Sequence, residues 1–153
     1  MLSKKTKYGL RALLLLAREY GHGPLLISEL AQREGIPKKF LELILLELKN
    51  EGMLQSKKGR GGGYSLSKSP DRITLGHVIR ALGGPLAPVP CVSQTAYQKC
   101  EECRDEMTCG IRLVMKDVRD ATARILDGTT LAEVLRRMES AAKLGRELSA
   151  YSI

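Results

Sequence analysis

The residues from 37 to 66 constrain the fold most strongly. Within the segment 38–51, apolar residues recur at intervals of three and four positions, at Leu41, Ile44, Leu45 and Leu48. This spacing places the four side chains on one face of a helix, where they can pack against a core. Gly52 follows, and glycine is the residue type that most often terminates a helix in the left-handed conformation. The pattern therefore predicts a helix over Lys38–Glu51 that stops sharply at Gly52.

A positively charged hairpin is predicted directly after this helix. Met53–Lys57 has the composition of a short strand, and the sequence GRGGGYSL over residues 59–66 indicates a tight turn that returns as a second strand. Between Met53 and Lys68 there are four basic residues and no acidic one. A helix followed by a small basic hairpin is typical of a winged helix-turn-helix, a fold that binds DNA.

The residues before Pro37 fit the same interpretation. Ser28 is a suitable N-cap for a short helix over Glu29–Glu34, and Leu25–Ile27 is predicted to form a short strand beside the hairpin. The turn Gly35–Pro37 then separates two helices at helix-turn-helix spacing. Two ordinary packed helices would show the same pattern, so the basic hairpin is the feature that favours nucleic acid.

Two further helices complete the predicted head. One is expected over Ser3–Tyr20, and the other begins at Thr74, which can cap its N-terminus. The residues expected to face the core are Tyr8, Leu10, Leu13, Leu14, Ala17 and Tyr20 in the first and Leu75, Val78, Ile79 and Leu82 in the second. Basic side chains crowd the start of the first helix, at Lys4, Lys5, Lys7 and Arg11. Positive charge at the N-terminus of a helix is unfavourable, because it opposes the helix dipole. These basic side chains are therefore expected to serve another purpose, and contact with DNA phosphates is the obvious candidate.

The positive charge is confined to one half of the chain. Residues 1–82 hold 15 Lys and Arg against 7 Asp and Glu, whereas residues 83–153 hold 10 of each, so the whole net charge of +8 belongs to the first half. Neutralising phosphates and releasing their counterions drives protein binding to polyanions. The charge therefore indicates double-stranded DNA as a partner, with a basic surface kept for solubility as the alternative.

Other classes of protein fit less well. The apolar run Leu10–Ala17 is interrupted by Arg11 and is too short to span a bilayer, so we expect a cytoplasmic protein with no membrane contact. The glycine run is not followed by Gly-Lys-Ser/Thr, and the two histidines are isolated, so no enzyme motif is present. In a reducing cytosol, cysteines are ligands or redox sensors more often than disulfide partners.

The second half of the chain is predicted to sense and to dimerise. In a helix predicted over Gly110–Asp127, apolar residues follow the three–four rhythm of helices that pack along their length, at Ile111, Val114, Val118, Ala121 and Ile125. A contact within the chain could cover this stripe, but a homodimer is favoured because little else is available to do so. Thr130–Glu133 forms a capping box that opens a last helix ending near Leu144. The predicted fold is mainly α: a winged helix-turn-helix domain over residues 1–82, a linker and sensor loop over 83–109, and dimerisation and C-terminal helices over 110–153.

Four cysteines form the one group of residues in the sequence that could bind a metal or carry out redox chemistry. They are Cys91, Cys100, Cys103 and Cys109. Thiolates bind iron–sulfur clusters or zinc, and a loop lets several of them converge. Cys109 precedes a long helix, whose dipole favours the thiolate. An iron–sulfur cluster is the preferred interpretation, with zinc, metal-free thiol sensing and chance placement as alternatives.

The assembled pattern resembles the Rrf2 family of bacterial transcription regulators. The likeness rests on TKYGLRALLLLA, FLELILLELKNEGML, the hairpin GRGGGYSL, ITLGHVIRALGG, a cysteine loop and a long helix, and it covers nearly the whole chain. The resemblance implies a homodimer in which two long helices cross. It also implies an iron–sulfur cluster, with [2Fe-2S] slightly favoured over [4Fe-4S], or control by cysteine chemistry or a partner protein instead. A dimeric adaptor that does not read DNA is a further alternative.

The resemblance also implies which residues carry these roles. Lys38, Lys39 and Glu42 would face the major groove, although an ion pair between Glu42 and Lys38 is an equal alternative for that carboxylate. The DNA-binding residues predicted in total are Lys4, Lys5, Ser28, Lys38, Lys39, Glu42, Lys57, Lys58, Arg60, Gly61 and Tyr64. Cys103 and Cys109 match the last two cluster ligands of the family, and either Cys91 or Cys100 would be the first.

Overall fold

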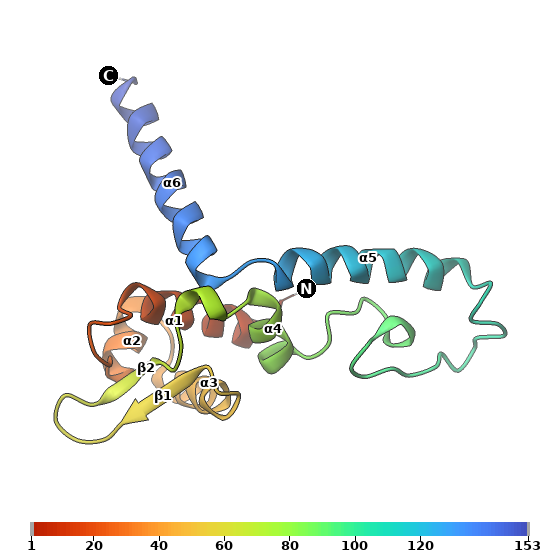
Figure 1. The fold of residues 1–153 in the computed structure, drawn as a ribbon, viewed down its shortest axis with the longest axis horizontal. Coiled ribbons are helices and arrows are strands. Elements are labelled where there is room, and N and C mark those ends of the chain that lie inside the picture. The colour runs from red at the N-terminus through yellow and green to blue at the C-terminus, as the bar shows by residue number, and fades with distance from the viewer. Residues whose placement is uncertain (1, 153) are drawn as a thin grey trace.

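Helices make up most of this protein. The computed structural model describes residues 2–152, within which there are six α-helices, two 3-10 helices and one two-stranded antiparallel sheet. In chain order the elements are α1 (Lys4–Arg18), α2 (Ile27–Glu34), α3 (Lys38–Asn50), β1 (Leu54–Lys57), β2 (Gly63–Leu66), η1 (Pro70–Arg72), α4 (Leu75–Gly83), η2 (Pro90–Val92), α5 (Gly110–Asp127) and α6 (Leu131–Ala150). Helices α1 to α4 and the hairpin form a head, and α5 and α6 leave it in different directions (Figure 1).

The core of the head is built on α3, as the sequence predicts. Leu41, Ile44, Leu45 and Leu48 are completely buried, and they pack with side chains from α1, α4 and the hairpin. Gly52 follows the C-cap of α3 with a φ of +75°, a conformation that costs glycine little and other residues more. The strand pairing joins Leu54 to Leu66 and Lys57 to Gly63, so the predicted helix and hairpin are both confirmed.

Helix α1 buries more than the predicted face. Leu13 and Ala17 are buried as predicted, and Tyr8, Leu10 and Leu14 are partly buried. Ala12, Leu15 and Leu16 are buried as well, whereas Tyr20 is 46% exposed. The reason is that α1 lies between α3, α4 and α6, which bury a broad arc of its surface. Tyr20 also falls beyond the end of the helix at Arg18.

The start of α2 differs from the prediction too. The helix begins at Ile27 with Leu26 at the N-cap, so Ser28 lies in its first turn and caps nothing. Tertiary contact decides this boundary, because the backbone of Leu25 is paired with Tyr64 of β2 through hydrogen bonds of 2.9 and 2.7 Å. The short strand predicted over Leu25–Ile27 is thereby reduced to a single bridge.

Thr74 and Thr130 cap α4 and α6 as predicted, through hydrogen bonds from the backbone of His77 and Glu133 to their hydroxyl oxygens. The predicted end of α6 near Leu144 is wrong, because the helix continues through Gly145 to Ala150. No helix within residues 2–152 is long and apolar enough to cross a membrane.

Candidate DNA-binding face and cysteine centre

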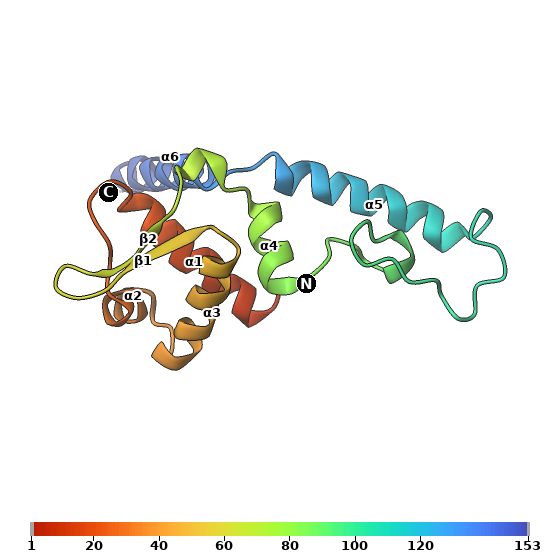
Figure 2. The same ribbon diagram turned by 60° about the horizontal axis from the view of Figure 1, so that its bottom comes forward.

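A concave surface lies between α3, the start of α2 and the hairpin, which are neighbours in Figure 2. We call it the concave face. It is lined by Leu26, Ile27, Ser28, Lys38, Glu42, Lys49, Ser56, Lys57, Lys58, Gly63 and Tyr64. Six of the predicted DNA-binding residues are thus brought together, although they come from three separate segments of the chain. Lys39, Arg60 and Gly61 are exposed outside this lining.

The basic side chains of this region are not neutralised by the protein itself. Within residues 2–152, Lys38, Lys57, Lys58 and Arg60 form no ion pair, although ten such pairs occur elsewhere. Glu42 has no ion-pair partner in that part of the chain either, so the alternative that it pairs with Lys38 finds no support. The charges therefore remain available to an anionic ligand.

Lys49 lies off the buried stripe of α3 and was expected to be available to solvent or a partner, but it was not among the predicted DNA-binding residues. Its ammonium donates a 2.7 Å hydrogen bond to the hydroxyl of Ser56 on β1, which links α3 to the hairpin. Lys49 follows Glu42 by seven residues, so helical periodicity alone places the two on one side of α3. That spacing was the signal available in the sequence.

The basic residues at the start of α1 have partners of their own. Lys5 forms a 2.7 Å ion pair with Glu47 of α3, and the Lys4 ammonium lies 5.8 Å from the centre of the Tyr8 ring. Lys5 therefore joins two helices of the head in this structure. Phosphate contacts by Lys4 and Lys5 stay predictions.

The four cysteines line a single cavity of about 640 Å³ beside the N-terminus of α5. All four are free thiols; Cys100 is exposed and the other three are partly buried. Within residues 2–152 no three Cys, His, Asp or Glu side chains are already grouped closely enough to hold a metal ion. The donor set nevertheless fits a thiolate-bound iron–sulfur cluster or zinc ion, provided that the loop closes around it.

The loop that carries the cysteines is fastened to α5 by two arginines. Arg112 donates a 3.3 Å hydrogen bond to the carbonyl oxygen of Cys91, and Arg119 donates one of 2.6 Å to that of Val92. The two arginines are seven residues apart, and therefore lie on one side of the helix. They hold the backbone of Cys91 against α5, near Cys109 at its N-cap.

Hydrogen bonds also connect residues within the cysteine loop. The Tyr97 hydroxyl donates to Glu106 at 2.6 Å, which raises the pKa of Tyr97. Asp105 accepts hydrogen bonds from the Met107 backbone and the Thr108 hydroxyl, and these lower the pKa of its carboxyl. Desolvation, reinforced by the negative charges of Cys109 and Glu106, raises the pKa of Cys103. Thiolate formation at Cys103 is therefore opposed, although the positive charge of Lys99 acts in the other direction.

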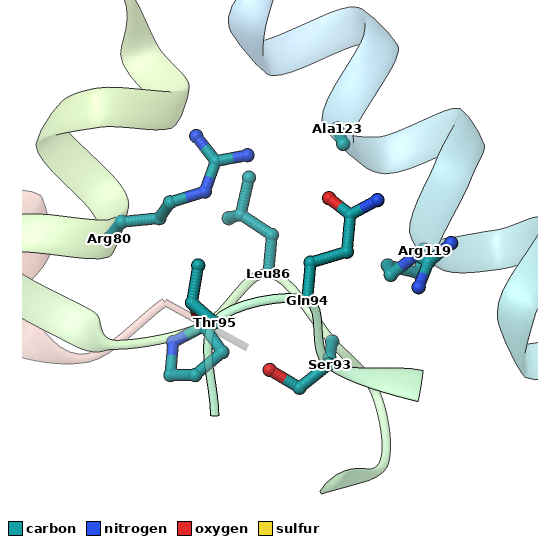
Figure 3. Close-up of a pocket in the computed structure, with 9 residues that line it drawn as sticks. Arg80, Leu86, Ser93, Gln94, Thr95, Arg119 and Ala123 are labelled. Atoms are coloured by element: carbon teal, nitrogen blue, oxygen red, sulfur yellow. The ribbon is translucent and has the colours of Figure 1, made fainter. Parts of the chain in front are cut away.

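The opposite end of α5 is joined to the head. Arg80 of α4 binds Asp127 through two hydrogen bonds of 2.7 and 2.8 Å. Gly76 leaves room for this approach, because a Cβ atom there would overlap the Asp127 carboxylate and force it to shift. Figure 3 shows Arg80 and Arg119 on two sides of a small cavity of about 20 Å³, with loop residues 93–95 beside it. The linker, α4 and α5 therefore meet at one junction.

We expect Asp127→Asn to lower the free energy of unfolding at pH 7 by about 0.5–1 kcal/mol, since the ion pair is partly exposed. Arg80 lowers the pKa of Asp127, so the folded state binds this proton less readily than the unfolded chain. The stabilisation is thus present at neutral pH and is lost as the pH falls below about 4 and through the lowered pKa. Urea unfolding at several pH values measures this difference. Asp117→Asn, on the same helix, is the control, and equal effects of the two would contradict the prediction.

The apolar stripe of α5 is uncovered. Ile111, Val114, Val118 and Ile125 are between 43 and 69% exposed, and Ala121 is partly buried. The chain does not cover the stripe with its own residues between 2 and 152, so the alternative of a contact within the chain is wrong. Val118 also borders a groove of about 670 Å³ with Leu2, Ile79 and Leu82 of the head.

Comparisons with known proteins agree with this geometry. Residues 2–137 match the family model Rrf2, described as an iron-dependent transcriptional regulator. The rrf2-like HTH-type transcriptional regulator of Rhodobacter capsulatus is 44% identical over 94% of this chain and 98% of its own length. The HTH-type transcriptional regulator CymR of Bacillus subtilis is 35% identical over 87% of this chain and 88% of its own length.

Solved structures give the same result for the fold. The structure of CymR, the global cysteine regulator of B. subtilis, superposes with a TM-score of 0.73 at 34% identity, over 88% of this chain and 95% of that one. The IscR structure from T. potens superposes with a TM-score of 0.74 at 28% identity, over 92% of this chain and 90% of that one.

Proposed function

Because this chain belongs to the Rrf2 family of helix-turn-helix transcription regulators, we propose that it acts in the cytoplasm as a homodimer that reads double-stranded DNA under the control of its cysteine loop. The observation that supports this most strongly is the concave face. There, lysines of α3 and the hairpin that form no ion pair within residues 2–152 line the same surface as Glu42, while four thiols lie apart from them beside α5.

DNA recognition is divided among the parts of that surface. Lys38 and Lys39 donate to guanine or to phosphate, and Glu42 accepts from the amino group of cytosine. In the hairpin, Lys57, Lys58 and Arg60 contact phosphates or the minor groove, and the glycines at 61–63 let the backbone come close. Ser28, Tyr64 and the α1 lysines supply further contacts with the DNA backbone.

The dimer forms through the uncovered stripe of α5. We expect Val118→Glu to raise the dissociation constant of the dimer by roughly 100-fold or more, because each copy would bury an unpaired carboxylate. Sedimentation at micromolar concentration would then show a shift from twice the chain mass of 16.8 kDa to that of one chain. Lys116→Glu changes an exposed residue off the stripe and should leave the dimer intact. A monomeric wild-type protein would overturn the assignment.

The cysteine loop is the regulatory site. Cys103 and Cys109 would hold an iron–sulfur cluster together with Cys91, which Arg112 keeps against α5, while the more exposed Cys100 is the additional thiol. A cluster bound there would supply sensitivity to iron supply and to oxidants. The likeness to CymR, a global cysteine regulator, supports a second candidate, in which the loop works without a metal and a partner protein or a thiol signal controls it.

Control reaches the DNA through α5. The loop is fastened near the N-terminal half of this helix by Arg112 and Arg119, and Asp127 at its other end is fixed to α4 by Arg80. Ordering the loop therefore restricts how α5 leaves the head, and in a dimer this sets the separation of the two heads.

Anaerobic purification tests this proposal directly. Visible absorption with matching iron and acid-labile sulfide indicates a cluster, zinc alone indicates a structural ion, and neither indicates the metal-free candidate. Selection of bound duplexes by each form then shows whether its sequence preference depends on what the loop holds. Absence of duplex binding in every form would contradict the DNA-reading role.

A further inference from the structure

Two leucines on the outer surface of α3 are left uncovered. Leu43 is 61% exposed and Leu46 is 49% exposed, although the opposite side of the same helix is completely buried. Single exposed leucines are common on protein surfaces, so exposure alone carries no function. The position of Leu43 is what distinguishes it.

Leu43 lies in the first half of α3 and outside the lining of the concave face. It directly follows Glu42, which lines the concave face, and it stands one turn beyond the exposed Lys39. Neither neighbour has an ion-pair partner within residues 2–152, so Leu43 is bordered by groups available to bases and phosphates. In helix-turn-helix proteins the N-terminal residues of the second helix contact base edges.

The major groove offers an apolar side chain one methyl group to pack against. Thymine carries a C5-methyl group there, whereas the other bases present hydrogen-bond donors and acceptors. Leucine against those polar edges would displace water and leave the edges unpaired, which is unfavourable. Contact with the thymine methyl instead removes apolar surface of both groups from water.

We propose that Leu43 selects thymine, through contact of its methyl groups with the C5-methyl of a base next to the one read by Glu42. The inference rests on the proposed DNA binding and adds a base preference to it. Helix α3 would then recognise two bases in different ways: the Glu42 carboxylate accepts a hydrogen bond from cytosine, and Leu43 packs against the methyl group of thymine. The basic residues Lys38, Lys39, Lys57 and Lys58 around this surface match the charge of a duplex.

The test uses duplexes selected by the wild-type protein. Each thymine of a half-site is replaced in turn by deoxyuridine, which removes the methyl group and leaves hydrogen bonding unchanged. Affinity is measured by fluorescence anisotropy at constant salt. At one position per half-site we expect the wild type to lose about fourfold in affinity, the factor that corresponds to one buried methyl group.

Two variants decide whether Leu43 is responsible. Leu43→Ala should bind thymine and deoxyuridine duplexes equally, and Leu43→Gln should select adenine at that position, since glutamine can pair with the adenine edge. Leu46→Ala is the matched control, one turn further along α3, and should keep the wild-type discrimination. Both positions are exposed in the wild type, and circular dichroism confirms that the variants fold.

The outcomes distinguish failure of thymine selection by Leu43 from failure of DNA binding itself. Tight, selective binding by the wild type with no loss at any deoxyuridine overturns the thymine readout and leaves DNA recognition intact. Discrimination retained by Leu43→Ala, or abolished equally by Leu46→Ala, also overturns it. A wild type that binds no duplex overturns the readout together with its premise.

Discussion

The double variant Lys58→Glu with Arg60→Glu is expected to bind every duplex about 100-fold more weakly than the wild type at moderate salt. Both residues lie at the turn of the hairpin, are exposed and have no ion-pair partner within residues 2–152. Each phosphate contact releases condensed counterions, and reversal replaces that gain by repulsion. Since phosphates carry no sequence information, the preference among duplexes should change little.

Salt dependence provides the sharper readout of the same variant. The slope of log affinity against log salt should become shallower by about two, one unit for each phosphate that the hairpin no longer neutralises. Lys143→Glu with Arg146→Glu makes the same change in net charge on the exposed end of α6, and should leave both affinity and slope near the wild-type values. Equal losses of affinity in the two double variants would show that net charge alone, and no specific interaction of the hairpin, causes the effect.

Removal of Cys109 is expected to eliminate the proposed iron–sulfur cluster. Cys109 is the N-cap of α5 and borders the cavity that all four cysteines share, so its thiol is held in place by the helix more firmly than those in the loop. Cys109→Ala and Cys103→Ala should each reduce iron and visible absorption from stoichiometric to background levels. Iron analysis and absorption after anaerobic purification measure this, and the apo variants should select duplexes as the metal-free wild type does.

Cys100→Ala is the matched control for these variants. Cys100 is the exposed cysteine of the four, and it has no hydrogen bond from α5 comparable with the one that Arg112 makes to Cys91. It should therefore retain most of the iron, whereas Cys91→Ala should lose it. Full retention of iron by Cys109→Ala would contradict the assignment of Cys109 as a ligand, and equal losses in all four variants would show that every cysteine is a ligand.

Local pattern was enough for much of the DNA-binding head. The stripe of α3, its stop at Gly52, the hairpin and the Thr74 cap each depend on residues within a few positions of one another, and all are present in the structure. The boundaries of α5 at Gly110 and Asp127 were predictable for the same reason.

Where distant segments meet, local pattern was insufficient. The buried face of α1 depends on packing by α3, α4 and α6, and the start of α2 depends on the bridge between Leu25 and Tyr64. The end of α6 was misjudged because Gly145, with no atom near its missing side chain, does not interrupt the helix. Among site residues, Arg112 and Arg119 were missed, since their partners Cys91 and Val92 are identified only by the fold. Helical spacing left Lys49 available on α3, but its bond to Ser56 is likewise identified only by the fold.

The sequence by itself determined which secondary-structure elements form and which chemical groups they carry. These are the helix α3 of the helix-turn-helix, a basic hairpin, four thiols and the helix α5 with an apolar stripe. Periodicity, glycine conformation and charge act over a few residues, so they can be read without coordinates. Only the tertiary structure decided how these parts are connected, with the thiols fastened to one end of α5 and the head to the other through Arg80 and Asp127. Those contacts join residues up to 47 positions apart, and their geometry follows from packing of the whole chain, not from any local preference.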